Sequence, residues 1–120
     1  MQIYKSYTFE AAHMLPNVPY GHQCGNLHGH SYKVTVYVEG EVSKEMGWVI
    51  DFDQISTAVK PLINQLDHSY LNDIEGLENP TSENLAIWFA EKLKTFQGLK
   101  KIEINETEKT GCVLKLNGNV

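Results

Sequence analysis

The chain has 120 residues, of which 42% are hydrophobic and 21% are charged. This length suits one domain spanning residues 1–120, and the composition is that of a soluble globular protein with its own core. The formal net charge of -5 and the lack of any basic run argue against a nucleic-acid-binding protein. No segment is apolar enough for a membrane span or a secretion signal, and two distant cysteines suggest a reducing compartment, so we expect a cytoplasmic protein.

Alternating apolar residues predict two strands in the first third of the chain. The first covers residues 2–12, and His13 extends its apolar face, which consists of Tyr7, Phe9 and Ala11. The second covers residues 30–39, with apolar side chains at the even positions Tyr32, Val34, Val36 and Val38. His28 and His30 share the parity of that apolar face.

Helical spacing follows in the middle of the chain. The first helix begins after a cap at Asp51 or Asp53, and its apolar stripe is Ile55, Val59, Leu62, Ile63 and Leu66. The second begins near Thr81-Ser82-Glu83 and is predicted to end at Gly98; its stripe is Leu85, Phe89, Leu93 and Phe96.

Two further strands, near residues 100–106 and 111–117, are expected to form a hairpin around Lys109-Thr110-Gly111. The order of two strands, two helices and two strands (ββααββ) predicts an α+β domain with an antiparallel four-stranded sheet and both helices on one face. Such a sheet has free edges and an open face, which favours a homo-oligomer.

Three histidines lie close to the first two strands. Side chains two apart on a strand point the same way, so His28 and His30 can reach one ion. With His13 they make three neutral nitrogen donors and no obligatory fourth protein ligand, the pattern of a catalytic zinc with one open position. The alternative is that these are ordinary core or surface histidines.

Cys24 permits three interpretations. The first is a fourth zinc ligand, which would close the site and make it structural. The second is a small buried hydrophobic residue, and the third is a thiolate base whose pKa a nearby metal lowers. His22, two residues earlier, is interpreted as a supporting or incidental residue.

Two acidic positions carry similar ambiguity. Asp67 and His68 end the first helix, where a histidine either interacts with the helix dipole or is oriented by the aspartate for proton transfer. Glu106 continues the alternation of Ile102 and Ile104, so it should project from their apolar side. There it either pairs with a lysine or accepts two hydrogen bonds from a planar heterocycle.

Six motifs, in order along nearly the whole chain, resemble the 6-pyruvoyltetrahydropterin synthase superfamily. They are Phe9-Glu10-Ala11-Ala12-His13, Cys24-x-x-x-His28-Gly29-His30, Gly47-Trp48-Val49-Ile50-Asp51-Phe52, Leu66-Asp67-His68, Asn79-Pro80-Thr81-Ser82-Glu83-Asn84 and Asn105-Glu106-Thr107. The short spacing between Cys24 and His28 looks like the bacterial branch, the 6-carboxytetrahydropterin synthases of the queuosine pathway, because pyruvoyl-forming relatives usually carry a longer insert there.

The resemblance implies a T-fold, an antiparallel sheet backed by two helices, that assembles through sheet edges into a homohexamer with active sites between subunits. It implies zinc ligation by His13, His28 and His30. It also implies that Cys24 is the proton-abstracting thiol and that Glu106 grips the pterin ring.

By the same resemblance, Asp67 and His68 form an acid–base relay, and Thr81 and Ser82 contact the substrate at a helix terminus. The implied reaction converts 7,8-dihydroneopterin triphosphate to 6-carboxy-5,6,7,8-tetrahydropterin, acetaldehyde and triphosphate, with zinc and no external redox cofactor. The alternatives are a pyruvoyl-forming lyase without carbon–carbon cleavage and a non-catalytic, zinc-stabilised pterin-binding module. Since the chain has no arginine, lysines, backbone amides or helix N-termini must bind the triphosphate.

Overall fold

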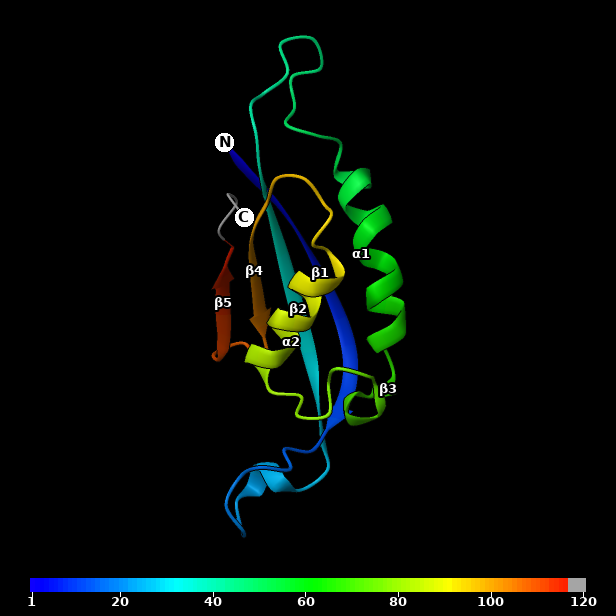
Figure 1. Ribbon diagram of the computed structural model, residues 1–120, viewed down its shortest axis with the longest axis vertical. Helices are drawn as coiled ribbons and strands as arrows, with labels where there is room; N and C mark the ends of the chain where they lie inside the picture. The colour runs from blue at the N-terminus through cyan, green and yellow to red at the C-terminus, as the bar shows by residue number, and fades with distance from the viewer. Residues whose placement is uncertain (117–120) are drawn as a thin grey trace.

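The computed structural model describes residues 1–116 and has two helices packed on one face of a sheet (Figure 1). The helices and strands, in chain order, are β1 (Gln2–His13), β2 (His28–Glu39), α1 (Phe52–Leu66), β3 (Ser69–Tyr70), α2 (Ser82–Lys92), β4 (Leu99–Asn105) and β5 (Gly111–Lys115). Two short 3-10 turns, η1 (Gln23–Gly25) and η2 (Leu71–Asp73), lie in the connections. The α+β architecture with both helices on one side is confirmed.

The sheet is larger than predicted and is not purely antiparallel. Its strand order is β3-β1-β2-β4-β5, so the prediction of four strands is wrong by one. The additional strand, β3, pairs in parallel with Ala11 and Ala12 of β1, which makes the sheet mixed. A strand of two residues has no alternation of side chains that a sequence pattern can reveal.

The pairing of β1 with β2 forms the longest ladder in the sheet. It runs from the pair Gln2–Glu39 to the pair His13–His28, with a continuous antiparallel register. The apolar faces predicted for both strands are buried beneath the helices, and the most enclosed side chains on them are Phe9, Tyr32, Val34, Val36 and Val38. The phenyl ring of Phe9 stacks on the ring of Tyr32 with centroids 5.0 Å apart.

Both helices begin where the sequence predicts. Asp51 caps α1 by accepting a hydrogen bond from the backbone N–H of Asp53, and Thr81 caps α2 by accepting one from Asn84. The end predicted for the second helix is wrong, because α2 stops at Lys92 and Gly98 lies in the turn before β4. Gly98 has a φ of +87°, and a Cβ there would lie 2.8 Å from the carbonyl oxygen of Glu39.

Strands β4 and β5 form the expected hairpin, although the predicted end of the last strand at residue 117 lies outside the described residues. The described chain is elongated, with principal extents of 57 × 27 × 27 Å. The loop of residues 14–27 projects from one end, and the loop of residues 40–51 projects from the other (Figure 1). Within residues 1–116, no helix is both long enough and apolar enough to cross a lipid bilayer.

Candidate metal centre and active site

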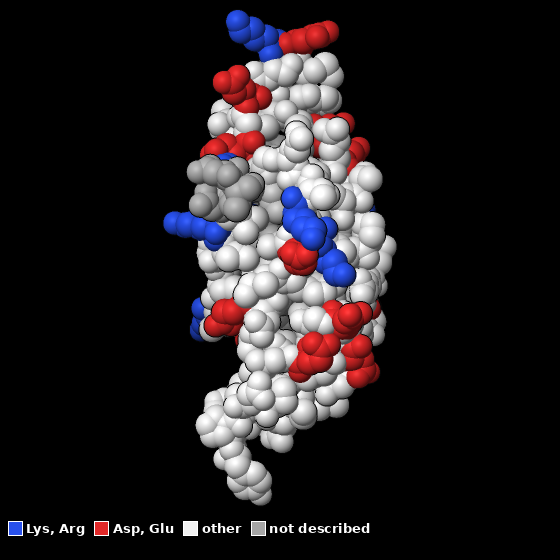
Figure 2. Space-filling model, in the orientation of Figure 1, with Lys and Arg blue, Asp and Glu red and all other residues white. Residues whose placement is uncertain are grey.

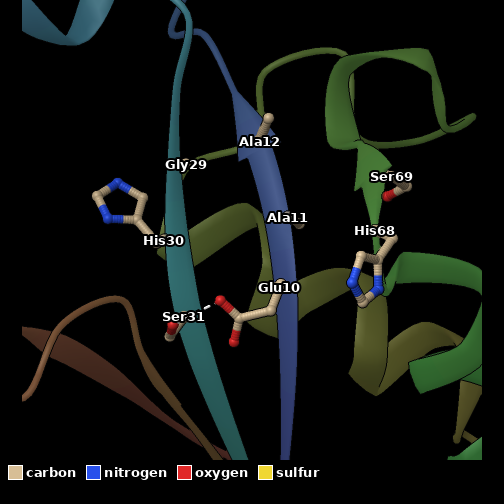
Figure 3. A pocket seen from close by; sticks show the side chains of 8 residues that line it. All are labelled: Glu10, Ala11, Ala12, Gly29, His30, Ser31, His68 and Ser69. Carbon is tan, nitrogen blue, oxygen red and sulfur yellow. Dashed lines mark hydrogen bonds between the residues drawn. The ribbon is translucent and has the colours of Figure 1, made fainter.

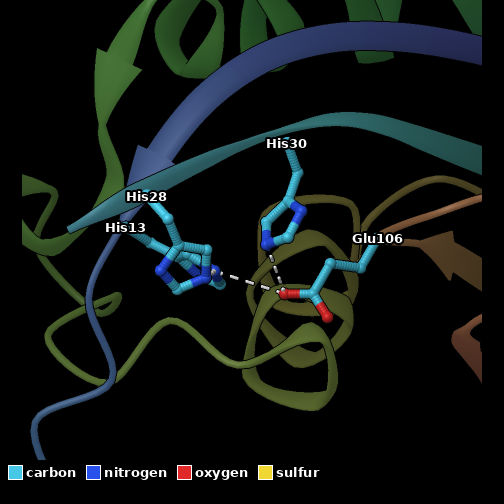
Figure 4. Close-up of side chains that lie close together, drawn as sticks. All are labelled: His13, His28, His30 and Glu106. Carbon is cyan, nitrogen blue, oxygen red and sulfur yellow. Dashed lines mark hydrogen bonds and ion pairs between the residues drawn. The ribbon is translucent and has the colours of Figure 1, made fainter. Parts of the chain in front are cut away.

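The β1–β2 ladder brings the three predicted histidines together at one end of the sheet. His13 is the last residue of β1 and pairs directly with His28, the first residue of β2. His30 pairs with Ala11 on the same face. Figure 4 shows the three imidazole rings converging from the two strands on one point, and His13 is fully buried there.

Backbone carbonyls set the proton position on two of these rings. The Nδ1 atom of His13 lies 2.8 Å from the carbonyl oxygen of Pro80, and Nδ1 of His28 lies 2.7 Å from that of Asn26. A carbonyl oxygen only accepts hydrogen bonds, so each Nδ1 carries the proton and donates it. In the neutral rings, each Nε2 therefore keeps a free lone pair.

These lone pairs face each other. Nε2 of His13 and Nε2 of His28 are 2.9 Å apart, and Nε2 of His30 is buried without a hydrogen-bond partner among the described residues. Two lone pairs at this distance repel each other unless one ring is protonated or a cation lies between them. The arrangement therefore fits three imidazoles that share a metal ion.

Glu106 completes the group from the end of β4, on the apolar side that its alternation predicts. Its Oε1 atom lies 3.2 Å from Nε2 of both His13 and His30 (Figure 4). Ligand atoms of His13, His28, His30 and Glu106 all lie within 4.8 Å of one another, which makes this group a candidate metal site. Imidazole nitrogens and a carboxylate oxygen are donors that zinc accepts.

Burial favours the neutral, metal-binding form of two of the rings, those of His13 and His30. It lowers the pKa of His13 and of His30 below the ordinary histidine value, because desolvation disfavours the imidazolium. Tyr32, whose hydroxyl lies 3.1 Å from Nδ1 of His13, has its pKa raised by burial and by the charge of Glu106. Burial thus favours neutral imidazoles at His13 and His30 beside a protonated phenol at Tyr32.

Cys24 lies in the projecting loop, on the turn η1, and is a free, half-buried thiol. Its sulfur is not part of the metal-binding group found among residues 1–116, in which Glu106 is the fourth member. The backbone N–H of Cys24 donates to Nδ1 of His22 at 3.0 Å, and its carbonyl accepts from the N–H of Leu15 at 2.9 Å. His22 thus supports the turn that carries Cys24.

Asp67 and His68 form a pair that is separate from the metal group. Oδ2 of Asp67 lies 3.0 Å from Nδ1 of His68, whose side chain is 80% exposed, and His68 has a positive φ of 58°. Oδ1 of Asp67 accepts the backbone N–H of Glu10 at 2.9 Å, and this bond lowers the pKa of the carboxyl.

The pair lies beside a pocket on the other face of the sheet. Figure 3 shows His68 next to Glu10, whose side chain accepts a hydrogen bond from Ser31. His30 also lines this pocket, but its ring projects from the opposite side of β2. Residues of alternate parity point to opposite faces of a strand, which explains this separation. One copy of the chain therefore does not unite Asp67 and His68 with the metal group.

Thr81 and Ser82 lie at the N-terminus of α2, next to the metal group. Thr81 is the cap of this helix, Ser82 is its first residue, and the preceding Pro80 holds the ring of His13 through its carbonyl. Unpaired backbone N–H groups at a helix N-terminus can bind an anionic or polar ligand group.

The sequence pattern did not identify Asn72 as part of this region. Its side chain bonds to both backbone groups of Met14, the residue after His13. A contact between segments 58 residues apart leaves no local periodicity, and only the position of Asn72 shortly after Asp67 and His68 hints at a role.

Comparison with known proteins identifies the family. The family model described as 6-pyruvoyl tetrahydropterin synthase matches residues 2–117. The chain belongs to this family. It is 46% identical over 112 residues to a 6-carboxy-5,6,7,8-tetrahydropterin synthase of Synechocystis, covering 88% of this chain and 85% of the relative.

Other family members extend the comparison. The chain is 36% identical to a dihydroneopterin monophosphate aldolase of Pyrococcus furiosus, over 94% of this chain and 95% of that protein. The solved structure of Caenorhabditis elegans 6-pyruvoyl tetrahydropterin synthase superposes with a TM-score of 0.88 and 30% identity, covering 98% and 96% of the two chains. The T-fold prediction is thereby confirmed.

We predict that removing one imidazole abolishes metal-dependent stabilisation. A metal that binds only the folded state at a hundredfold excess over its Kd stabilises the protein by about 2.7 kcal/mol. Zinc should therefore raise the unfolding temperature of the wild-type apoprotein but not of His28→Ala, measured by scanning calorimetry. His22→Ala, outside the group, should respond like the wild type, and an equal response of His28→Ala would show that the metal binds elsewhere.

Proposed function

We propose that this protein is a zinc-dependent lyase that converts 7,8-dihydroneopterin triphosphate and water to 6-carboxy-5,6,7,8-tetrahydropterin, acetaldehyde and triphosphate. The observation that carries the proposal is the pair of facing lone pairs on His13 and His28, beside Nε2 of His30, which makes no hydrogen bond among the described residues and lies 3.2 Å from Oε1 of Glu106. The 46% identity to a protein named for this product supports the choice of reaction. The product would serve queuosine biosynthesis.

The three imidazoles would hold the zinc, and the fourth position would remain for the substrate. The bound metal would supply Lewis acidity to the hydroxyl oxygens of the pterin side chain, which makes adjacent protons easier to remove. The backbone carbonyls of Pro80 and Asn26 orient two of the ligands and fix their tautomers, as hydrogen-bond partners of ligating histidines do.

The remaining residues divide the proton transfers between them. Cys24, as a thiolate, would remove a proton from the substrate side chain. Asp67 would hold His68 in one orientation, so that His68 exchanges protons on the opposite side of the substrate. A protein that only binds pterins needs neither group, so their presence supports catalysis.

Glu106 would hold the amino-substituted pterin ring through two hydrogen bonds. Its side chain is 27% exposed, and only Oε1 contacts the imidazole nitrogens of His13 and His30. Oε2 is therefore left for the pterin ring, and its two lone pairs can accept both hydrogen bonds. A role as a fourth metal donor competes with this assignment, and the two roles make different predictions below.

Substrate contacts beyond the ring would come from the start of α2. The hydroxyl groups of Thr81 and Ser82, with the backbone amides of that turn, would bind polar groups of the substrate. The triphosphate would rely on lysines or backbone amides, because no arginine fork is available.

A complete active site would need more than one copy of the chain. Asp67 and His68 lie across the sheet from the metal group, so a second copy would supply them, in a homo-oligomer that is a hexamer by resemblance. Two features support assembly: β5 forms an edge of the sheet, and the projecting loop of residues 14–27 contains no Asp, Glu, Lys or Arg. Figure 2 shows this loop as an uncharged extension below a surface of interspersed charges.

The partners and location follow from the same proposal. The substrate would be a small pterin triphosphate rather than a nucleic acid, in keeping with the net charge of -5. Both cysteines are free, which suits the reducing cytoplasm.

The deciding experiment is an assay of products. The zinc-loaded protein should release acetaldehyde, trapped as a hydrazone, in equal amount with 6-carboxytetrahydropterin identified by mass. A pyruvoyl product without acetaldehyde would make the protein a pyruvoyl-forming lyase. Turnover of dihydroneopterin monophosphate instead would favour the chemistry named for the Pyrococcus furiosus relative, and no product at all would leave a pterin-binding module.

We predict that Cys24→Ala retains zinc and loses turnover. Loss of a general base lowers the rate by about 10²–10⁴-fold, which steady-state product formation measures. Cys112→Ala is the matched control, because Cys112 lies on β5 and should leave turnover unchanged. A large fall in the zinc content of Cys24→Ala would make Cys24 a ligand and refute the assignment as base.

We predict that Glu106→Ala weakens pterin binding more than zinc binding. Hydrogen bonds to a charged group contribute about 1.5–3 kcal/mol each, or roughly tenfold to a hundredfold in Kd. Fluorescence titration with a pterin and chelator competition for zinc measure the two affinities separately. Glu108→Ala removes the same charge at an exposed position and should alter neither the pterin affinity nor the zinc affinity. Equal losses of the two affinities in Glu106→Ala would identify Glu106 as a metal ligand.

A further inference from the structure

We propose that Asn72 is a positioning residue that holds the metal ligand His13 and the start of the Cys24 loop in their working arrangement. The proposal rests on the function proposed above, and it concerns a side chain that touches neither the metal group nor the thiol.

The amide of Asn72 binds both backbone groups of one residue. Its Oδ1 accepts the N–H of Met14 at 3.0 Å, and its Nδ2 donates to the carbonyl oxygen of Met14 at 2.7 Å. A side-chain amide offers the same donor and acceptor as a peptide group. Asn72 therefore pairs with Met14 as a neighbouring strand residue would.

This pairing extends a parallel ladder beyond its last backbone bonds. Asp67 and His68 bond to the two backbone groups of Glu10, and β3 pairs with Ala11 and Ala12. Asn72 lies in the turn η2, and there its side chain rather than its backbone bonds to Met14. The segment of residues 67–72 thus follows β1 along its end.

Met14 connects the two reactive parts of the site. It directly follows His13, and its other neighbour, Leu15, donates its N–H to the carbonyl of Cys24 at 2.9 Å. Fixing the peptide groups on either side of Met14 therefore restricts the position of the His13 ring. It also restricts the position of Cys24, because the backbone of Leu15 bonds to that of Cys24. A shift in that backbone would move both at once.

Asn72 also contacts the segment that holds the ring of His13. Its Nδ2 lies 3.4 Å from the carbonyl oxygen of Glu78, two residues before Pro80, whose carbonyl accepts from Nδ1 of His13. The side-chain amide of Asn72 thus links the segment that carries His13 to the segment that orients the His13 ring. Groups that hydrogen-bond directly to metal ligands change the metal affinity by about 10–100-fold when they are substituted, and Asn72 acts one contact further out, so we expect an effect at the lower end of that range.

The test uses Asn72→Asp, which keeps the shape and the acceptor for the N–H of Met14. The second carboxylate oxygen would face the carbonyls of Met14 and Glu78 without a proton to donate. We expect a Zn²⁺ affinity lower by about tenfold or more, measured by competition with a chromophoric chelator. We also expect a changed rate of alkylation of Cys24 by iodoacetamide, measured in a Cys112→Ala background so that one thiol reports.

The matched control is Asn64→Asp, the same substitution on the exposed surface of α1. It should change neither readout. Asn72→Ala, which removes the bonds without adding a charge, is the second variant, and circular dichroism verifies the fold of each before measurement.

A merely structural role predicts a different result. Folded Asn72 variants with a Zn²⁺ affinity and an alkylation rate within twofold of wild type, and only a lower unfolding temperature, would overturn the proposal. The readouts do not depend on turnover, so the two proposals fail separately. Loss of affinity in a protein that makes no acetaldehyde would reject only the proposed reaction.

Discussion

The register between β1 and β2 is the constraint on which the rest of the structure depends. It places His13 opposite His28 and puts His30 on the same face. A shift of one residue would move every side chain of a strand to the opposite face, so the apolar residues that fix the core also fix the positions of the three histidines. Burial of Phe9 and Tyr32 beneath the helices thus determines where the imidazoles meet.

The parts of the site that lie on this ladder could be predicted from the sequence. Alternation in a strand has a period of two, so the common face of His28 and His30, and the side on which Glu106 projects, follow from the neighbouring apolar residues. The caps Asp51 and Thr81 could be predicted for a different reason, because capping is an interaction between residues two or three apart in the sequence.

The parts held by long-range contacts could not be predicted in this way. The strand β3 has only two residues, and its parallel partner is far away in the sequence. The bonds of Asn72 to Met14, and of the Pro80 carbonyl to His13, join segments more than fifty residues apart and leave no pattern. The position of Asp67 and His68 across the sheet likewise depends on how the end of α1 meets β1.

The projecting loop has a consequence for how such a chain can evolve. Because the β1–β2 ladder ends by pairing His13 directly with His28, the residues between Leu15 and Cys24 can lengthen, shorten or change composition while the bonds of Met14 to Asn72 and of His28 to Asn26 keep the imidazoles in place. Loops tolerate such changes better than the strands that bear them. Descendants of one ancestor could therefore present different side chains beside the same group of three imidazoles.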